Sequence, residues 1–127
     1  MVHKKIKFYF IAFLIIIIDQ ITKAFLTKTT NTGVACGLFK GNTTLIILIS
    51  LIITGIILYY LVKSNSFILS IGLSFLLGGA VSNLLDRVFL GHVRDFIQIF
   101  IIPTFNIADM FNVIGALLII IYLVKKD

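Results

Sequence analysis

The stretch FILSIGLSFLLGGAVSNLLDR, Phe67–Arg87, carries no charged residue before Asp86. A helix needs about 20 mainly apolar residues to cross the hydrocarbon core of a bilayer, and this stretch has that length. Three similar stretches complete the chain of 127 residues, of which 60% are hydrophobic and only 13% charged. We predict an all-α membrane protein with four transmembrane helices and a small extracytoplasmic loop region, a single integral membrane domain over 1–127. The predicted spans are 6–26, 45–62, 67–85 and 108–124.

The net charge of +6 does not indicate a nucleic-acid protein, because the lysines lie at the ends of apolar stretches and form no basic stripe. Four spans place both termini on one side. That side has six basic residues against five on the other, which leans weakly toward cytoplasmic termini. The single Cys36 and the widely separated His3 and His92 form no metal-ligand pattern, so we predict neither a metal nor a cofactor. A nucleophilic pair of Cys36 and His92 has no evident third orienting group.

Every acidic residue except Asp127 falls at the same end of the predicted bundle. Ionisable groups in membrane segments are costly, and they usually face a partner, a cavity or a functional site. Simple anchoring remains an alternative, because helix ends are where charges cost least. The four gathered acids are Asp19, Asp86, Asp95 and Asp109.

Local patterns divide these acids by role. On the third span Asn83, Asp86 and Arg87 share a helical face, and Asp86 is interpreted as the ionic partner of Arg87. Asp19 is interpreted as a helix-end support near Lys23. Gly78 and Gly79 in the same stretch are interpreted as packing residues.

The sequence Asn106-Ile107-Ala108-Asp109 has the form of a helix start, with Asn106 as N-cap. A helix N-terminus favours an ionised carboxylate at Asp109. Asp95, followed by apolar residues, would tend to keep its proton. Two such carboxyls held close together can activate water for attack on a peptide carbonyl. Between them, Phe96–Ile102 is too short to cross a membrane and is predicted to be interfacial or re-entrant.

Four motifs in this order resemble the bacterial lipoprotein signal peptidases, the signal peptidase II family. The motifs are DQITK (Asp19–Lys23), NTGVACGLF (Asn31–Phe39), GGAVSNLLDR (Gly78–Arg87) continuing through GHVRDFI (Gly91–Ile97), and FNIAD (Phe105–Asp109). Each motif alone is weak, but the ordered set covers nearly the whole chain.

The resemblance implies an intramembrane aspartic endopeptidase that cleaves prolipoproteins before a diacylglyceryl-modified cysteine. The family's catalytic pair corresponds to Asp95 and Asp109, and Asn31 and Arg87 would hold substrate or inhibitor. The implied partners are the prolipoprotein, membrane lipid and the inhibitor globomycin, bound to a monomer. The implied location is the bacterial cytoplasmic (inner) membrane, with cytoplasmic termini and an extracytoplasmic active site. The residues resembling the family's supporting set are Asp19, Lys23, Asn31, Gly33, Asn83, Asp86, Arg87, Asn106 and Ala108.

The sequence departs from the family pattern in four places. The segment from Lys23 to Asn31, where the family forms a sheet-like cradle, is short, and the loop Phe96–Phe105 is trimmed. Cys36 and Ser82 replace an aromatic residue and a glycine. Two other functions remain open at this point: a small proton-coupled transporter, which needs a carboxylate near mid-membrane, and a scaffold whose acids only anchor helix ends.

Overall fold

Four long helices make up most of the protein in a computed structural model that describes residues 2–26, 29–31, 33 and 39–126. The helices are α1 (Val2–Leu26), α2 (Thr43–Lys63), α3 (Phe67–Leu90) and α4 (Ile107–Lys126). All four are long and apolar enough to cross a membrane, which confirms the predicted fold class. The third helix continues to Leu90, beyond the predicted span end at 85, so that Asp86 and Arg87 lie within it.

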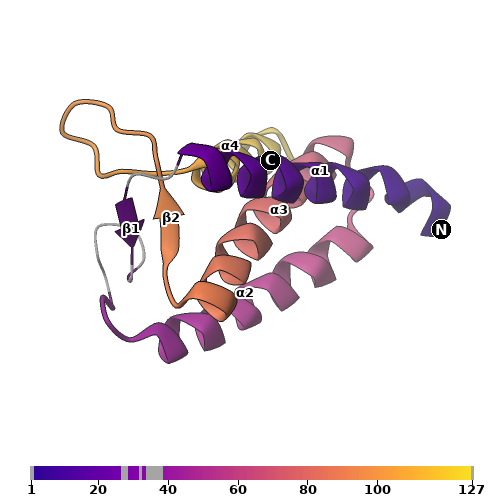
Figure 1. Cartoon of the computed structure of the whole chain (residues 1–127). Coiled ribbons are helices and arrows are strands. Elements are labelled where there is room, and N and C mark those ends of the chain that lie inside the picture. Colours follow the sequence, from indigo (N-terminus) through magenta and orange to yellow (C-terminus); the bar gives the residue numbers. More distant parts are fainter. Residues whose placement is uncertain (1, 27–28, 32, 34–38, 127) are drawn as a thin grey trace.

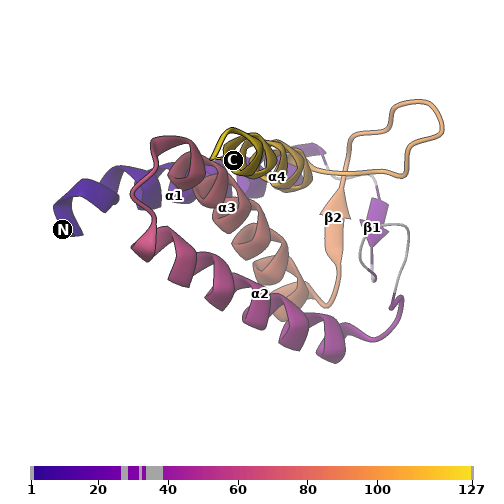
Figure 2. The same ribbon diagram turned by 180° about the vertical axis from the view of Figure 1, so that it is seen from behind.

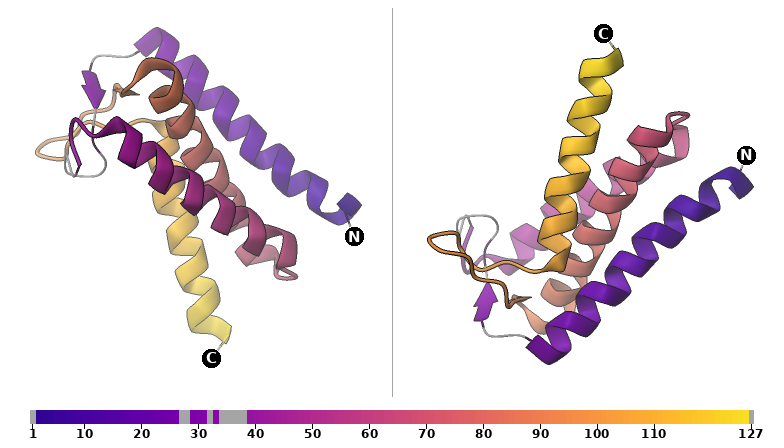
Figure 3. Two further views of the ribbon diagram at one scale, coloured as in Figure 1. Left: turned by 90° about the horizontal axis from the view of Figure 1, so that it is seen from below. Right: turned by 90° about the horizontal axis from the view of Figure 1, so that it is seen from above.

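Helix α3 is the centre of the bundle and packs against the other three helices (Figures 1 and 3). Its glycines allow this close approach. A Cβ added at Gly78 would lie 2.8 Å from Ile15 Cβ on α1, and one at Gly72 would lie 2.9 Å from the Gly115 carbonyl oxygen on α4. Real Cβ atoms do not come this near, so these contacts require glycine. The interpretation of Gly78 as a packing residue is confirmed.

The outer faces of α1, α2 and α4 carry large exposed apolar side chains. Phe13 on α1, Ile52 on α2 and Leu117 on α4 are each more than half exposed. In water such a surface would drive aggregation. In a bilayer it faces lipid tails, which is the arrangement expected for membrane-spanning helices.

A small two-stranded sheet lies beyond the helices. Strand β1 (Thr29–Asn31) pairs antiparallel with β2 (Val93–Asp95), with Thr29 opposite Asp95. After β2 the chain makes a projecting loop, drawn in orange and visible from both sides in Figures 1 and 2. A bridge between Ile97 and Phe105 closes this loop, and at its tip Phe100 is 92% exposed. An apolar tip of this kind suits the predicted interfacial role of the segment, which stays a prediction.

The two ends of the bundle differ in what they carry. The sheet lies at one end, and we call this the ribbon end. The chain termini lie at the end away from the sheet, although α4 diverges from the other helices (Figure 3). The ribbon end gathers the end of α1, the end of α3 and the start of α4, which are the segments that hold the predicted site.

Candidate active site

The last part of α1 contributes a fully buried ion pair. Asp19 and Lys23 are one helical turn apart, both are 0% exposed, and Lys23 Nζ lies 2.6 Å from Asp19 Oδ2. Asp19 also accepts hydrogen bonds from Ser82 Oγ on α3 (2.6 Å) and from the backbone N–H of Ala108 on α4 (2.8 Å). One carboxylate therefore ties α1 to the two other helices that form the site. The predicted neighbourhood of Asp19 and Lys23 is confirmed.

Helix α3 supplies the next residues of the network. Lys23 Nζ donates to Asn83 Oδ1 (3.0 Å) and lies 3.2 Å from Asp86 Oδ2. Asp86 also pairs with Arg94 on β2, whose Nη2 donates to Asp86 Oδ1 at 2.9 Å and whose backbone N–H donates to Oδ2 at 3.0 Å. The predicted pairing of Asp86 with Arg87 is therefore wrong. Neighbouring residues on a helix do not face each other, and Asp86 turns toward β2 instead.

Arg87 points away from this pair. Its Nη2 donates to the carbonyl oxygen of Gly33 at 3.1 Å, which connects α3 to the segment after β1. Its Nε is buried and has no hydrogen-bond partner among the residues that the structure describes. A buried donor in this state costs free energy unless something accepts from it. Arg87 is thus suited to donate a hydrogen bond to a ligand oxygen beside the network.

The start of α4 forms a reciprocal cap. Asp109 N–H donates to Asn106 Oδ1 (2.9 Å), and Asn106 N–H donates to Asp109 Oδ2 (3.1 Å). Each side chain satisfies a backbone group that the first turn leaves unpaired. The predicted role of Asn106 as N-cap is confirmed. The cap also fixes the Asp109 carboxylate at the helix N-terminus.

Asn106 connects the two acids that sequence analysis singled out. Its Nδ2 donates to Asp95 Oδ1 at 3.0 Å and to Asn83 Oδ1 at 3.0 Å. Asn83 Nδ2 in turn donates to Asp109 Oδ1 at 2.9 Å. Both carboxyls therefore contact Asn106, Asp95 through the side chain and Asp109 through the backbone. Asp95 Oδ2 has no hydrogen bond to any residue in the described part of the chain.

Burial, and after it the negative charge of Asp109, raise the pKa of Asp95 from 3.8 to about 6. The hydrogen bond from Asn106 opposes this rise. Asp95 is 1% exposed and sits on β2, outside the helices. On the same strand, the hydrogen bond to Asp86 raises the pKa of Arg94, so that this guanidinium stays charged. The site thus contains a carboxyl that holds its proton more tightly than an exposed aspartic acid.

The structure brings most of the predicted site residues into one buried network. It contains Asp19, Lys23, Asn83, Asp86, Asp95, Asn106, Ala108 and Asp109. Gly33 and Arg87 contact each other beside it. Asn31 pairs through its backbone with Val93, but its side chain and Cys36 lie outside the described residues.

The sequence patterns did not single out three residues of the network, each next to a predicted one: Gln20, Ser82 and Arg94. Gln20 Oε1 accepts from Arg94 Nη2 at 2.6 Å, and Gln20 Nε2 donates to Asp86 Oδ1 at 3.0 Å. Gln20 donates as well to Ser82 Oγ, so the serine that replaces a family glycine has a polar role here. A long polar side chain inside an apolar span was the signal for Gln20, whereas Arg94 appeared only within the quoted motif GHVRDFI. The described residues contain no cluster of His, Cys, Asp or Glu able to hold a metal.

The chain matches the family model for Signal peptidase (SPase) II over residues 11–125, nearly its whole length. The chain belongs to the signal peptidase II family. The lipoprotein signal peptidase of Clostridium novyi (strain NT) is 40% identical over 103 residues, 76% of this chain and 70% of the relative. That of Halothermothrix orenii (strain H 168) is 31% identical over 139 residues, 94% and 96% of the two chains. The resemblance drawn from the four motifs is confirmed.

The fold of the family is also confirmed by a solved structure. A bacterial membrane enzyme, determined by the in meso method at 2.3 Å resolution, superimposes with a TM-score of 0.87. It is 31% identical, and the match covers 98% of this chain and 90% of that one. The short segment before β1 and the trimmed loop after β2 therefore leave the family architecture in place. The chain is a multi-pass membrane peptidase of this family.

Proposed function

We propose that this protein removes signal peptides from prolipoproteins by cleaving before the diacylglyceryl-modified cysteine, with Asp95 and Asp109 as its catalytic pair. Membership of the signal peptidase II family supports the activity. The observation that carries the residue assignment is the double contact of Asn106, which donates to Asp95 Oδ1 at 3.0 Å and to Asp109 Oδ2 at 3.1 Å. One residue thus holds both carboxyls at the start of α4.

The two carboxyls take different roles in this proposal. Asp109, which accepts hydrogen bonds at both oxygens and lies at a helix N-terminus, acts as the ionised base. It takes a proton from a water molecule as that water attacks the scissile carbonyl carbon. Asp95 gives its proton to the carbonyl oxygen, which forms a neutral tetrahedral intermediate. When the carbon–nitrogen bond breaks, Asp109 returns its proton to the leaving amine, and Asp95 recovers one from the collapsing hydroxyl.

The remaining residues of the network position this pair. Lys23 and Arg94 together neutralise Asp19 and Asp86, so these two carboxylates can stay buried beside the dyad. Asn83 and Asn106 fix the orientation of the two catalytic carboxyls. Arg87, whose Nε has no partner among the described residues, is proposed to hold the substrate backbone together with Asn31 and Gly33.

The proposed setting is the inner membrane of a bacterium, with cytoplasmic termini and the ribbon end at the extracytoplasmic face. A prolipoprotein, held by its diacylglyceryl chains in the outer leaflet, would reach the ribbon end from the lipid. The protein is proposed to work as a monomer and to be inhibited by globomycin. A transporter is less well supported, because Asp95 and Asp109 both lie at the ribbon end and not near mid-membrane.

Cleavage of a lipidated prolipoprotein by purified protein in proteoliposomes tests the proposal. Asp95→Asn and Asp109→Asn should each lower kcat by about a thousandfold or more. Removing one member of a set of cooperating catalytic residues has an effect of this size in other proteases. Asp127→Asn is the control, since this is the acid that sequence places apart from the others. Circular dichroism and monodisperse elution in detergent would show that each variant folds. Full activity in either dyad variant would refute the assignment, and globomycin should stop cleavage by the unaltered protein.

A further inference from the structure

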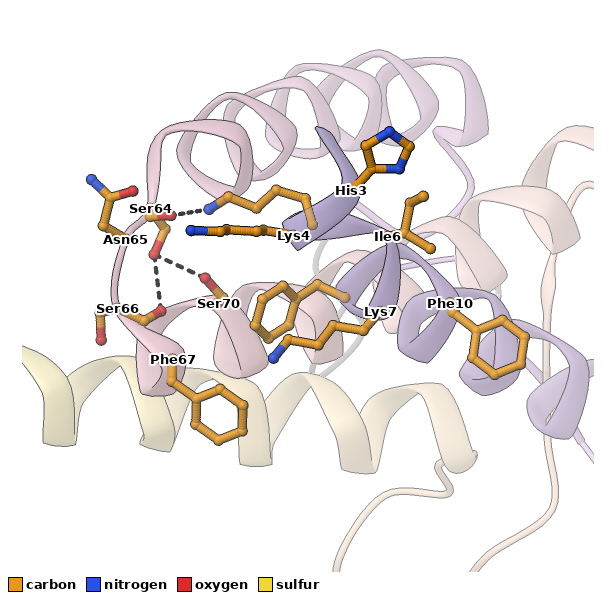
Figure 4. Close-up of a pocket in the computed structure, with 12 residues that line it drawn as sticks. His3, Lys4, Ile6, Lys7, Phe10, Ser64, Asn65, Ser66, Phe67 and Ser70 are labelled. Atoms are coloured by element: carbon orange, nitrogen blue, oxygen red, sulfur yellow. Dashed lines mark hydrogen bonds between the residues drawn. The ribbon is translucent and has the colours of Figure 1, made fainter. Parts of the chain in front are cut away.

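A basic hollow lies at the end of the bundle opposite the acids. It has a volume of about 660 Å³ and opens between the start of α1 and the turn that joins α2 to α3 (Figure 4). Lys4, Lys5 and Lys7 line it from α1, while Ser64, Ser66 and Phe67 line it from the turn and from α3. Nothing in the proposed peptidase mechanism uses this hollow, because every residue of that mechanism lies at the ribbon end.

The lysines of the basic hollow have no ion pair with any residue in the described part of the chain. Lys5 Nζ donates to the backbone carbonyl oxygen of Ser64. Lys7 Nζ lies 5.0 Å from the ring centre of Phe8 and 5.1 Å from that of Phe67. Lys4 is exposed and extends toward the turn (Figure 4). Three positive charges therefore line one opening, and no described carboxylate pairs with any of them.

The other walls of the hollow suit a group that has both polar and apolar parts. Ser64 and Ser70 are buried at its floor and joined by a hydrogen bond of 3.0 Å between their hydroxyls. Ser66 caps the start of α3, accepting from Leu69 N–H at 3.3 Å, so a helix N-terminus with its partial positive charge faces the same side. Phe67, 61% exposed, leads from the hollow onto the outer surface of the bundle.

We propose that the basic hollow binds one anionic phospholipid, with the headgroup phosphate held by Lys4 and Lys7 and an acyl chain lying along Phe67. Basic pockets between membrane helices bind anionic head groups in this way, because the phosphate sits at the level where the helices leave the hydrocarbon core. The location at the starts of α1 and α3 meets that condition. The substrate's own cationic leader is the wrong occupant, since signal peptides begin with a positively charged region that these lysines repel.

Lipid retention tests this site without reference to proteolysis. The full chain, purified in detergent, is mixed with phosphatidylglycerol or phosphatidylcholine, and bound lipid is counted by native mass spectrometry. We expect one phosphatidylglycerol to be retained per protein and phosphatidylcholine to be lost. Lys4→Gln combined with Lys7→Gln should weaken retention by about tenfold to thirtyfold. Each lysine near an anionic head group raises the affinity by roughly fivefold, and the double variant loses two.

The matched control is Lys125→Gln combined with Lys126→Gln, which removes the same charge from the last turn of α4. Retention within twofold of the unaltered protein is expected there. An equal loss in both double variants would mean general surface attraction and would overturn the proposal, as would equal retention of phosphatidylcholine. Displacement of the lipid by millimolar inorganic phosphate would assign the site to free phosphate instead. Circular dichroism confirms that the variants fold.

Discussion

The two ends of the helical bundle carry similar numbers of positive charges, but these charges differ in their burial and in their carboxylate partners. At the ribbon end Lys23 is 0% exposed and paired with two carboxylates, and Arg94 forks onto Asp86. At the other end Lys4 and Lys7 are exposed and have no carboxylate partner among the described residues. A charge out of contact with water needs partners, whereas a charge at the headgroup level is solvated. The first arrangement fixes geometry, and the second leaves charge available to a ligand.

The buried network is better explained by positioning than by stability. A buried ion pair is weak evidence for net stabilisation, because desolvation offsets most of its Coulomb energy. Breaking such a pair is costly all the same, since the remaining charge stays buried without a partner. Differences between the two ends should therefore appear most clearly when single charges are removed.

The largest expected difference between the ends concerns one lysine from each. Lys23→Met leaves Asp19 and Asp86 buried without their common partner and should destabilise the protein by about 3–5 kcal/mol. Lys126→Met, at an exposed position on the last turn of α4, should change stability by less than about 0.5 kcal/mol. Thermal unfolding in detergent measures both. Equal effects would mean that the two ends do not differ as described.

A second test uses pH at the ribbon end. Because the pKa of Asp95 is raised to about 6, this carboxyl keeps its proton below that pH and loses it above. The proposed mechanism needs that proton, so kcat/KM should fall about tenfold for each pH unit above the apparent pKa of the alkaline limb. This apparent pKa belongs to the coupled pair of Asp95 and Asp109. A profile that stays flat from pH 6 to pH 8 would contradict this role for Asp95.

The raised pKa of Asp95 also makes the stability of the folded protein depend on pH. The folded protein binds the Asp95 proton more tightly than the unfolded chain, so the contribution of Asp95 to stability falls as pH rises from 3.8 to about 6. In Asp95→Asn this part of the pH dependence should disappear. Unfolding midpoints of both proteins in detergent across this range provide the comparison.

A third test compares two glycines, one beside the network and one facing outward. A Cβ at Gly79 would lie 2.2 Å from Asn112 Oδ1 and 2.5 Å from the Ala108 carbonyl oxygen, so Gly79→Ala should force α3 and α4 apart and cost about 1–3 kcal/mol. A Cβ at Gly55 on α2 meets nothing within 4 Å, and Gly55→Ala should be neutral or slightly stabilising. If both variants unfolded at the same temperature, the close contact of α3 with α4 would not matter to stability.

The smallest expected effect concerns Arg94, which holds β2 to Asp86 and Gln20. Arg94→Met should lower kcat by about tenfold by loosening the strand that carries Asp95, with KM nearly unchanged. Arg94→Lys keeps the charge without the planar fork and should restore only part of the rate. A lower kcat together with a shifted alkaline limb distinguishes positioning of Asp95 from simple unfolding. An effect on KM alone would assign Arg94 to substrate binding instead.

Sequence patterns predicted the cap at Asn106 and the gathering of acids at one end because both depend on local spacing. A helix start and its first turn are fixed within four residues, and alternating spans decide which end each acid reaches. Partners from different helices could not be predicted in the same way. Asp86 was assigned to its neighbour Arg87, yet it pairs with Lys23 and Arg94, because packing and not adjacency decides which side chains meet.

By itself, the sequence determined that the chain crosses a membrane four times, that four of its five acids share one end and that it resembles the signal peptidase II family. Hydropathy, capping and motif order are properties of short segments, and they are readable without a fold. Only the tertiary structure decided that Gln20 and Arg94 join the network and that Asn106 contacts both Asp95 and Asp109. It alone also placed Lys4 and Lys7 around one hollow. These features depend on how closely α3 approaches its neighbours, which side-chain packing sets.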